Sequence, residues 1–138
     1  MDPKVLDYLS QERMSVLATA FADGSPHTAA MHFVYKDKAL YFSTHFGNRK
    51  LDGLNAGHTQ ASVCIGFSET DWTTLQMDGH IEKSDPVSTK SLILSKYPES
   101  EKYMDPSTVF LKFTPRWYRY TDFKVTPPAI IESDVHST

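Results

Sequence analysis

Two hydroxyl residues and two cationic residues lie close together in the first half of the chain. Ser43 and Thr44 end a stretch that alternates like a strand, and Arg49 and Lys50 follow Asn48, a residue type that often caps a helix. Hydroxyls, backbone amides and cations that meet where a strand leads into a helix are suited to bind an anion, with phosphate as the natural ligand. Cations at a helix start oppose its dipole, which favours a binding role. Ordinary surface charge in a first helical turn remains the alternative.

Other catalytic patterns are absent from the sequence. None of the six histidines has the spacing of a helical metal-binding pair, so no metal site is predicted. There is no glycine-rich phosphate loop and no serine nucleophile elbow. Cys64 lies within an apolar stretch and is expected to be a buried, unreactive residue. Since no catalytic residue can be assigned, the pattern fits a protein whose chemistry belongs to a bound cofactor.

Length and composition limit the classes of protein that need to be considered. The 138 residues predict a single domain over 1–138, and the net charge of −3 without a basic run argues against a nucleic-acid partner. No stretch approaches the roughly 20 apolar residues of a membrane span, and no signal-peptide core is present. The single cysteine excludes an internal disulfide. These features together predict a cytoplasmic protein without membrane contact.

The residues of this candidate anion site, Ser43, Thr44, Arg49 and Lys50, form an anion corner that must be positioned by a sheet. A helix is expected over about residues 1–12 because Asp2 and Pro3 form a typical helix start, and the same pair recurs at Asp85 and Pro86. Alternation predicts strands over 14–22, 27–35, 39–44, 61–67, 72–83 and 109–120, the first three forming an antiparallel meander. From about 124 to 138 a tail is expected. The fold class is therefore mainly β with short helices, a six-stranded antiparallel sheet that closes into a small barrel.

The residues around this corner resemble a known family. The stretch 42–50 is similar to the phosphate-binding signature of the pyridoxamine 5′-phosphate oxidase-like flavin proteins, which has an aromatic residue, a small residue, Thr, a variable stretch, and then Ser or Asn, Arg and Lys. Residues 17–26 resemble the first hairpin of that family, and 75–82 resemble its later long strand. The resemblance extends over about residues 10–120.

The resemblance implies a split β-barrel homodimer that binds FMN in two clefts at the subunit interface. By position, Ser43 and Thr44 would hydrogen-bond the phosphate, and Arg49 and Lys50 would pair with it beside Asn48. The resemblance implies three further groups of cofactor-binding residues. Ala30, Met31 and His32 would lie on the strand beside the flavin ring, and Thr74 and Gln76 would approach from the long strand of the same or the partner subunit. An aromatic residue, Trp117 or Tyr120, would close the cleft.

The sequence also departs from the family pattern. Ala29 and Val34 occupy positions where true pyridoxamine phosphate oxidases carry Arg and Lys, and no Arg- and Trp-rich segment follows Phe123. These departures argue against oxidation of pyridoxamine phosphate and favour the short, general-stress-protein-like branch. The resemblance therefore implies an FMN-dependent oxidoreductase that acts on an unknown small molecule. The alternatives are a non-catalytic flavin-binding or redox-sensing protein, or a member of the same fold that binds F420 or heme.

Overall fold

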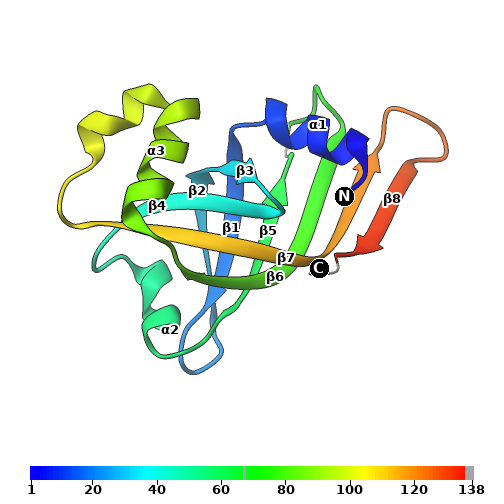
Figure 1. Cartoon of the computed structure of the whole chain (residues 1–138). Helices are drawn as coiled ribbons and strands as arrows, with labels where there is room; N and C mark the ends of the chain where they lie inside the picture. The colour runs from blue at the N-terminus through cyan, green and yellow to red at the C-terminus, as the bar shows by residue number, and fades with distance from the viewer. Residues whose placement is uncertain (67, 136–138) are drawn as a thin grey trace.

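The computed structural model describes residues 1–66 and 68–135, which form one strongly curved antiparallel sheet flanked by short helices (Figure 1). The helices are α1 (Pro3–Gln11), η1 (Arg49–Leu51), α2 (Asp52–Asn55), α3 (Pro86–Lys96) and η2 (Pro98–Tyr103). The strands are β1 (Met14–Ala20), β2 (Pro26–His32), β3 (Val34–Lys36), β4 (Ala39–His45), β5 (Gln60–Ile65), β6 (Thr73–Lys83), β7 (Thr108–Asp122) and β8 (Ala129–Asp134). The sheet order is β2-β1-β5-β6-β7-β4-β3, with β8 paired to β7.

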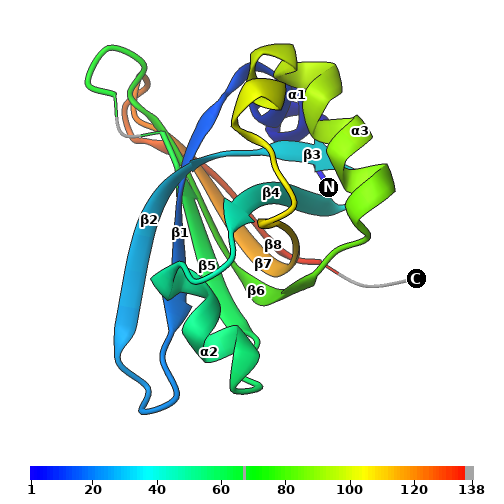
Figure 2. The ribbon, with the colours of Figure 1, turned by 90° about the vertical axis from the view of Figure 1, so that its left-hand side faces the viewer.

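The concave face of this sheet holds the core. Alternate side chains of β1, β4, β5 and β6 are buried there, as a half-buried strand requires. The fully buried members include Leu17, Leu40, Phe42, Ile65, Leu75 and Phe113. Helix α1 covers one end of this core with three buried side chains, Val5, Tyr8 and Leu9. The predicted mainly β, antiparallel fold is confirmed, but the sheet curls into a half-barrel that does not close between β2 and β3 (Figure 2), and the described residues form eight strands instead of six.

Both predicted Asp-Pro helix starts are confirmed. The Asp2 carboxylate accepts a hydrogen bond from the Lys4 amide over 2.8 Å, and the Asp85 carboxylate accepts one from the Ser88 amide over 2.9 Å. Each carboxylate satisfies an amide that has no partner inside its helix. None of the helices in the described ranges is long and apolar enough to cross a membrane.

The single strand expected over 27–35 is wrong, because the chain bends at Phe33. β2 pairs with β1, whereas β3 pairs with β4, so the two halves belong to different parts of the sheet. Phe33 is fully buried at the bend, and its amide donates to the Arg13 carbonyl over 3.3 Å. The expected meander is also wrong, since β4 pairs with β7 and not with β2. As a result β2 forms one end of the sheet.

The expected tail is likewise corrected. Residues 129–134 form β8, which pairs with the second half of β7. Most β8 side chains are exposed, so the segment lacks the alternation that marks a half-buried strand. The strand predicted over 61–67 corresponds to β5, which ends at Ile65. Phe67 and His136 lie outside the described residues.

A β-bulge bends the two longest strands. Gly79 pairs with Pro115 and Asp78 pairs with Trp117, so Arg116 is the extra residue in β7. A Cβ atom on Gly79 would lie 2.1 Å from the Thr114 carbonyl oxygen, which explains why glycine is needed there. Gly79 therefore permits the close approach of β6 and β7 at this bulge.

Candidate functional site

A pocket of about 300 Å³ lies between β2, β4 and the start of η1, and α3 and η2 close its far side. Figure 2 views the molecule from the side on which β2 and β4 face the reader, with α3 running beside β4. Its volume is at the lower end of the range for small-molecule sites, roughly 300–1,000 Å³. Most of the predicted cofactor-binding residues line it, namely Ala30, Met31, His32, Ser43, Thr44, Asn48 and Lys50.

Lys50 gives this pocket a cation that no group among residues 1–66 and 68–135 neutralises. Its side chain is half-buried, and burial lowers the pKa of its ammonium group. Within the described part of the chain, no carboxylate or other acceptor contacts that ammonium. A partly desolvated, unpaired cation is costly unless an anion binds it. The pocket is therefore suited to an anionic ligand group.

The corner beside Lys50 is fixed by a hydrogen bond between two side chains. The Asn48 amide nitrogen donates to the Thr44 hydroxyl oxygen over 2.8 Å, and Thr44 is buried at the end of β4. Asn48 occupies the N-cap position, but its side chain makes no capping bond. The helix predicted after Asn48 is only a short 3-10 turn followed by α2. Anion binding here must depend on side chains and local amides more than on a helix dipole.

Arg49 separates from Lys50 in the structure. Its guanidinium lies over the ring of Phe21, 5.0 Å from the centroid, and it is exposed. It does not line the pocket between β2 and β4. The two adjacent cations of the predicted signature therefore face different surroundings, and Lys50 is the one placed in the pocket.

The edge of β2 forms the opposite wall. Because β2 is the end strand of the sheet, one of its two backbone edges has no strand partner in the described part of the chain. Ala30 and His32 are exposed on this strand, while Met31 is buried in the core. Unpaired backbone N–H and C=O groups can hydrogen-bond the polar edge of a planar ligand.

The pocket also contains residues that the sequence interpretation missed: Tyr41, His45, Ile93, Tyr97 and Ser100. The alternation of β4 places Tyr41 and His45 on the face of Ser43, so period-two reasoning was sufficient to find them. The other three come from α3, its C-terminal boundary and η2, and no local signal connects those segments to β4.

Tyr97 is the buried anchor of this far wall. Its hydroxyl donates to the Phe33 carbonyl over 2.5 Å, and burial raises the pKa of Tyr97 to about 12. The His32 ring packs against the Tyr97 ring with centroids 4.9 Å apart, and the Arg13 guanidinium lies 4.7 Å from the same ring. Tyr97 thus fixes the position of His32 at the pocket wall.

Thr74 and Gln76 are not brought to this pocket within one chain. They lie on the convex face of β6, where Gln76 pairs in register with Cys64, Cys64 with Val16, and Val16 with Ala30. Three strand spacings, roughly 14 Å, therefore separate Gln76 from Ala30. Cys64 is only half-buried on this face, contrary to expectation, and burial raises the pKa of its thiol.

Trp117 lies still farther across the same convex face. It pairs in register with Asp78 on β6 and Asp134 on β8, and its indole N–H donates to Glu132 over 3.0 Å. Tyr120 is buried on the concave side, where its ring packs edge-on against Tyr8. Neither aromatic residue reaches the β2–β4 pocket of its own chain.

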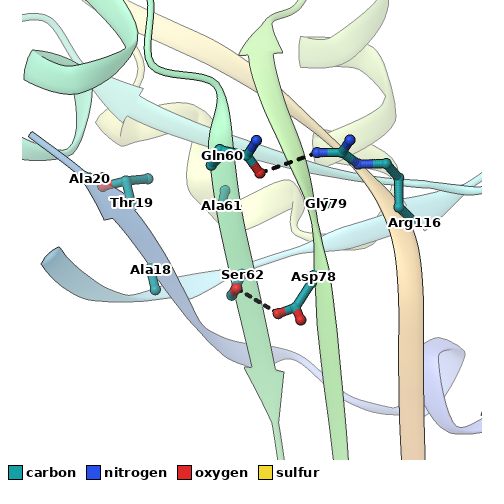
Figure 3. Close-up of a pocket in the computed structure, with 9 residues that line it drawn as sticks. All are labelled: Ala18, Thr19, Ala20, Gln60, Ala61, Ser62, Asp78, Gly79 and Arg116. Carbon is teal, nitrogen blue, oxygen red and sulfur yellow. Dashed lines mark hydrogen bonds between the residues drawn. The ribbon is translucent and has the colours of Figure 1, made fainter. Parts of the chain in front are cut away.

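A second hollow, of about 600 Å³, occupies the convex face, and Figure 3 shows the residues that line it. Its polar groups are already partnered, because the Ser62 hydroxyl donates to Asp78 over 2.7 Å and Arg116 donates to Gln60 over 3.2 Å. Ala18, Ala20 and Gly79 leave its floor without large side chains. Because Arg116 and Asp78 already have partners, this hollow is less suited to binding an anion than the pocket between β2 and β4, which contains Lys50.

Across residues 1–66 and 68–135, no cluster of three or more His, Cys, Asp or Glu side chains is arranged to hold a metal ion.

A family model described as pyridoxamine 5′-phosphate oxidase matches residues 1–122. The chain belongs to this family. A comparison with the curated proteins gave no match.

Several solved structures share the fold of this chain. A Clostridium acetobutylicum protein related to general stress protein 26 is 20% identical, with a TM-score of 0.71 and coverage of 96% of this chain and 92% of that chain. General stress protein 26 from Bacillus anthracis is 22% identical, with a TM-score of 0.70 and coverage of 94% and 96%. The heme storage protein HutZ from Vibrio cholerae is 15% identical, with a TM-score of 0.72 and coverage of 83% and 89%. At these identities the likeness establishes the fold alone.

Proposed function

We propose that this member of the pyridoxamine 5′-phosphate oxidase family binds FMN in the β2–β4 pocket and is an oxidoreductase for a small molecule. The observation that carries the proposal is the half-buried Lys50, whose ammonium has no partner among the described residues. The phosphate group of FMN would supply the missing negative charge. Bound FMN would supply hydride-transfer chemistry, and the protein would supply position and electrostatics.

The pocket residues fit the two ends of the cofactor. Ser43, Thr44, Asn48 and Lys50 line the pocket where β4 leads into η1 and would hold the phosphate. The free backbone edge of β2 around Ala30, Met31 and His32 would face the polar edge of the flavin ring. This division matches the roles that the sequence resemblance implied for the same residues.

We further propose a homodimer in which the convex sheet face is the interface. Val16, Ala18, Ser62 and Cys64 make much of this face small and weakly polar, which suits close contact between sheets. In such a dimer, Thr74 and Gln76 would approach the cofactor of the partner subunit, since they cannot reach the pocket of their own chain. Both the dimer and the cytoplasmic location expected from the sequence remain predictions.

Heme binding is the second candidate, and one observation favours it. His32 and His45 line the same pocket, and either imidazole is a possible axial ligand of a heme iron. The described pocket offers the unpaired Lys50 cation as well, which favours the phosphate of FMN as ligand.

Absorption spectra of the purified protein test these candidates. FMN binding predicts flavin absorption bands in the purified protein or after addition of FMN, and quenched flavin fluorescence during titration. Parallel titrations with F420 and hemin identify the alternatives, hemin by a Soret band. A protein that binds F420 or hemin but not FMN would overturn the proposal. Reduction of bound FMN by NADH or NADPH, with reoxidation by an added acceptor, would support oxidoreductase activity, and flavin binding without any turnover would support the redox-sensing alternative.

A further inference from the structure

A short hydrogen-bonded chain ends at His45 in the β2–β4 pocket. Asp105 accepts two hydrogen bonds from Ser107, one from the hydroxyl over 2.5 Å and one from the amide over 2.8 Å. The Ser107 hydroxyl oxygen in turn lies 3.4 Å from Nδ1 of His45. The Phe46 amide donates to the Ser107 carbonyl over 2.7 Å, which ties this turn to the end of β4.

The directions of these bonds assign the protons. An ionised carboxylate can only accept, and the two bonds from Ser107 hold the pKa of Asp105 below its usual range. The single hydroxyl proton of Ser107 is therefore used by Asp105, and the Ser107 oxygen can only accept from His45. Nδ1 of His45 must then carry its proton. Nε2 is left as the nitrogen that gains or loses the second proton.

We infer that His45 is a pH-dependent phosphate ligand, held in its Nδ1–H form by Ser107 and Asp105 and donating to the anion from Nε2 when protonated. This inference deepens the proposed function and rests on it, because the anion in question is the phosphate of the bound flavin nucleotide. It assigns a role to a residue in the variable part of the phosphate-binding stretch, and it makes cofactor affinity depend on pH.

The charged surroundings of His45 come from several elements. Lys50 of η1 lines the same pocket and opposes a second positive charge there, while Asp105 favours it from the turn before β7. His32 of β2 is a second imidazole in the pocket, and Tyr41 of β4 and Tyr97 after α3 complete its titratable groups. Because His32 packs on Tyr97 and not on the Ser107 turn, the two histidines can be separated experimentally.

Imidazole ¹⁵N NMR of the whole protein tests the proton assignment. Neutral His45 should carry its proton on Nδ1, and Ser107→Ala should release this preference while the fold is retained. Addition of FMN should move the His45 titration midpoint to higher pH, whereas exposed His58, which does not line the pocket, should not move. Neutral His45 found as the Nε2–H form, or an FMN-bound protein with an unmoved His45 midpoint, would overturn the inference.

Binding measurements supply a second readout. His45→Gln should weaken FMN binding about tenfold at about pH 5.5 and much less at about pH 8, because only protonated imidazole donates from Nε2. Riboflavin, which lacks the phosphate, should show no such difference, and His58→Gln is the matched control. Equal FMN affinity of wild type and His45→Gln at low pH would refute the role of His45 and leave the proposed function standing. Failure of wild type to bind FMN at any pH would instead refute the proposed function, and this inference with it.

Discussion

The Asn48 side-chain amide donates a hydrogen bond to the Thr44 hydroxyl over 2.8 Å, joining the N-cap residue of the 3-10 turn η1 to the end of β4. Since the Thr44 oxygen accepts this bond, its own hydroxyl proton remains free to donate. A buried hydroxyl directed in this way is a ready donor for an anion. The hydrogen bond from Asn48 therefore stabilises the turn and also leaves the Thr44 hydroxyl as a donor toward the β2–β4 pocket.

Asn48→Asp should weaken FMN binding more than Asn48→Ala does. An aspartate can only accept, so Thr44 would donate to residue 48 instead of to the ligand, and the new negative charge would repel phosphate. Asn48→Ala should cost roughly 2- to 10-fold in affinity, the range for one neutral hydrogen bond. Fluorescence titration with FMN measures both, and Asn55→Asp, at the exposed end of α2, is the control. Equal affinities for the two Asn48 variants would contradict this assignment.

Lys50→Met should reduce FMN affinity by about 10- to 100-fold, because a charge-assisted hydrogen bond contributes roughly 1.5–3 kcal/mol. The free energy of unfolding without ligand should not fall, since methionine removes an ammonium that is half-buried and has no partner among the residues that the structure describes. Urea denaturation measures that energy, and exposed Lys4→Met serves as the control. A variant with unchanged FMN affinity would place the phosphate elsewhere. Arg49→Ala should have the smaller effect, because Arg49 lies over Phe21 outside the pocket.

Tyr97→Phe should lower the free energy of unfolding by about 1–3 kcal/mol, the cost of leaving a buried acceptor without its donor. The lost hydroxyl serves the Phe33 carbonyl at the bend between β2 and β3. Tyr103→Phe, in a side chain that is 65% exposed, should change stability little. Urea denaturation of the two variants provides the comparison, and equal stabilities would show that the Phe33 carbonyl finds another donor.

Glu12→Gln should make the protein more stable near neutral pH. Burial, followed by the negative charge of Asp71, raises the pKa of Glu12 above its usual 4.5. The folded state therefore binds the proton more tightly than the unfolded state, and stability falls as pH rises from about 4.5 through the folded-state value. Glutamine has no charge to lose, and its amide can donate to Asp71 Oδ2, which is buried and has no hydrogen-bond partner within the described ranges.

Thermal unfolding at a series of pH values checks this prediction. The gain from Glu12→Gln should be largest above the folded pKa and should vanish at pH values below about 4, where both states are protonated. Exposed Glu82→Gln is the control for loss of a negative charge. A gain that does not change with pH would show that Glu12 ionisation is not its cause.

Ala18→Glu should convert the proposed dimer into a monomer. Ala18 lies on the floor of the convex face (Figure 3), and a carboxylate there would add to the charge of Asp78 and oppose its counterpart in a symmetric interface. Light scattering after size-exclusion chromatography reports the mass, and circular dichroism confirms folding. Val87→Glu, on a residue of α3 that is 81% exposed, is the control. A monomeric wild-type protein would refute the dimer itself.

Local patterns were sufficient to predict that Ser43, Thr44, Asn48 and Lys50 lie close together. The alternation of β4, the turn after it and the charged pair all lie within one short stretch, so their proximity follows from chain connectivity alone. The two Asp-Pro helix starts were predictable for the same reason, because each cap acts within a few residues of itself.

The bend at Phe33 and the far wall of the pocket could not be predicted in this way. Period-two alternation continues across Phe33, but the pairing partner changes from β1 to β4, which only the folded sheet determines. Tyr97 reaches the pocket because α3 packs beside β4, a contact between segments distant in the sequence. β8 escaped notice because its exposed side chains carry no hydrophobic period.

The open backbone edge of β2 has a consequence for handling the protein. An unpaired strand edge is a template onto which a strand of another molecule can add, the first step of aggregation. Among the seven residues of β2, the only proline is Pro26 at the first position, and the only ionisable side chains are those of two histidines. The strand therefore lacks the lysine and internal proline residues that usually prevent such pairing. A ligand bound against this edge would therefore block the addition of another strand. Protein without ligand should precipitate sooner than protein with the ligand bound.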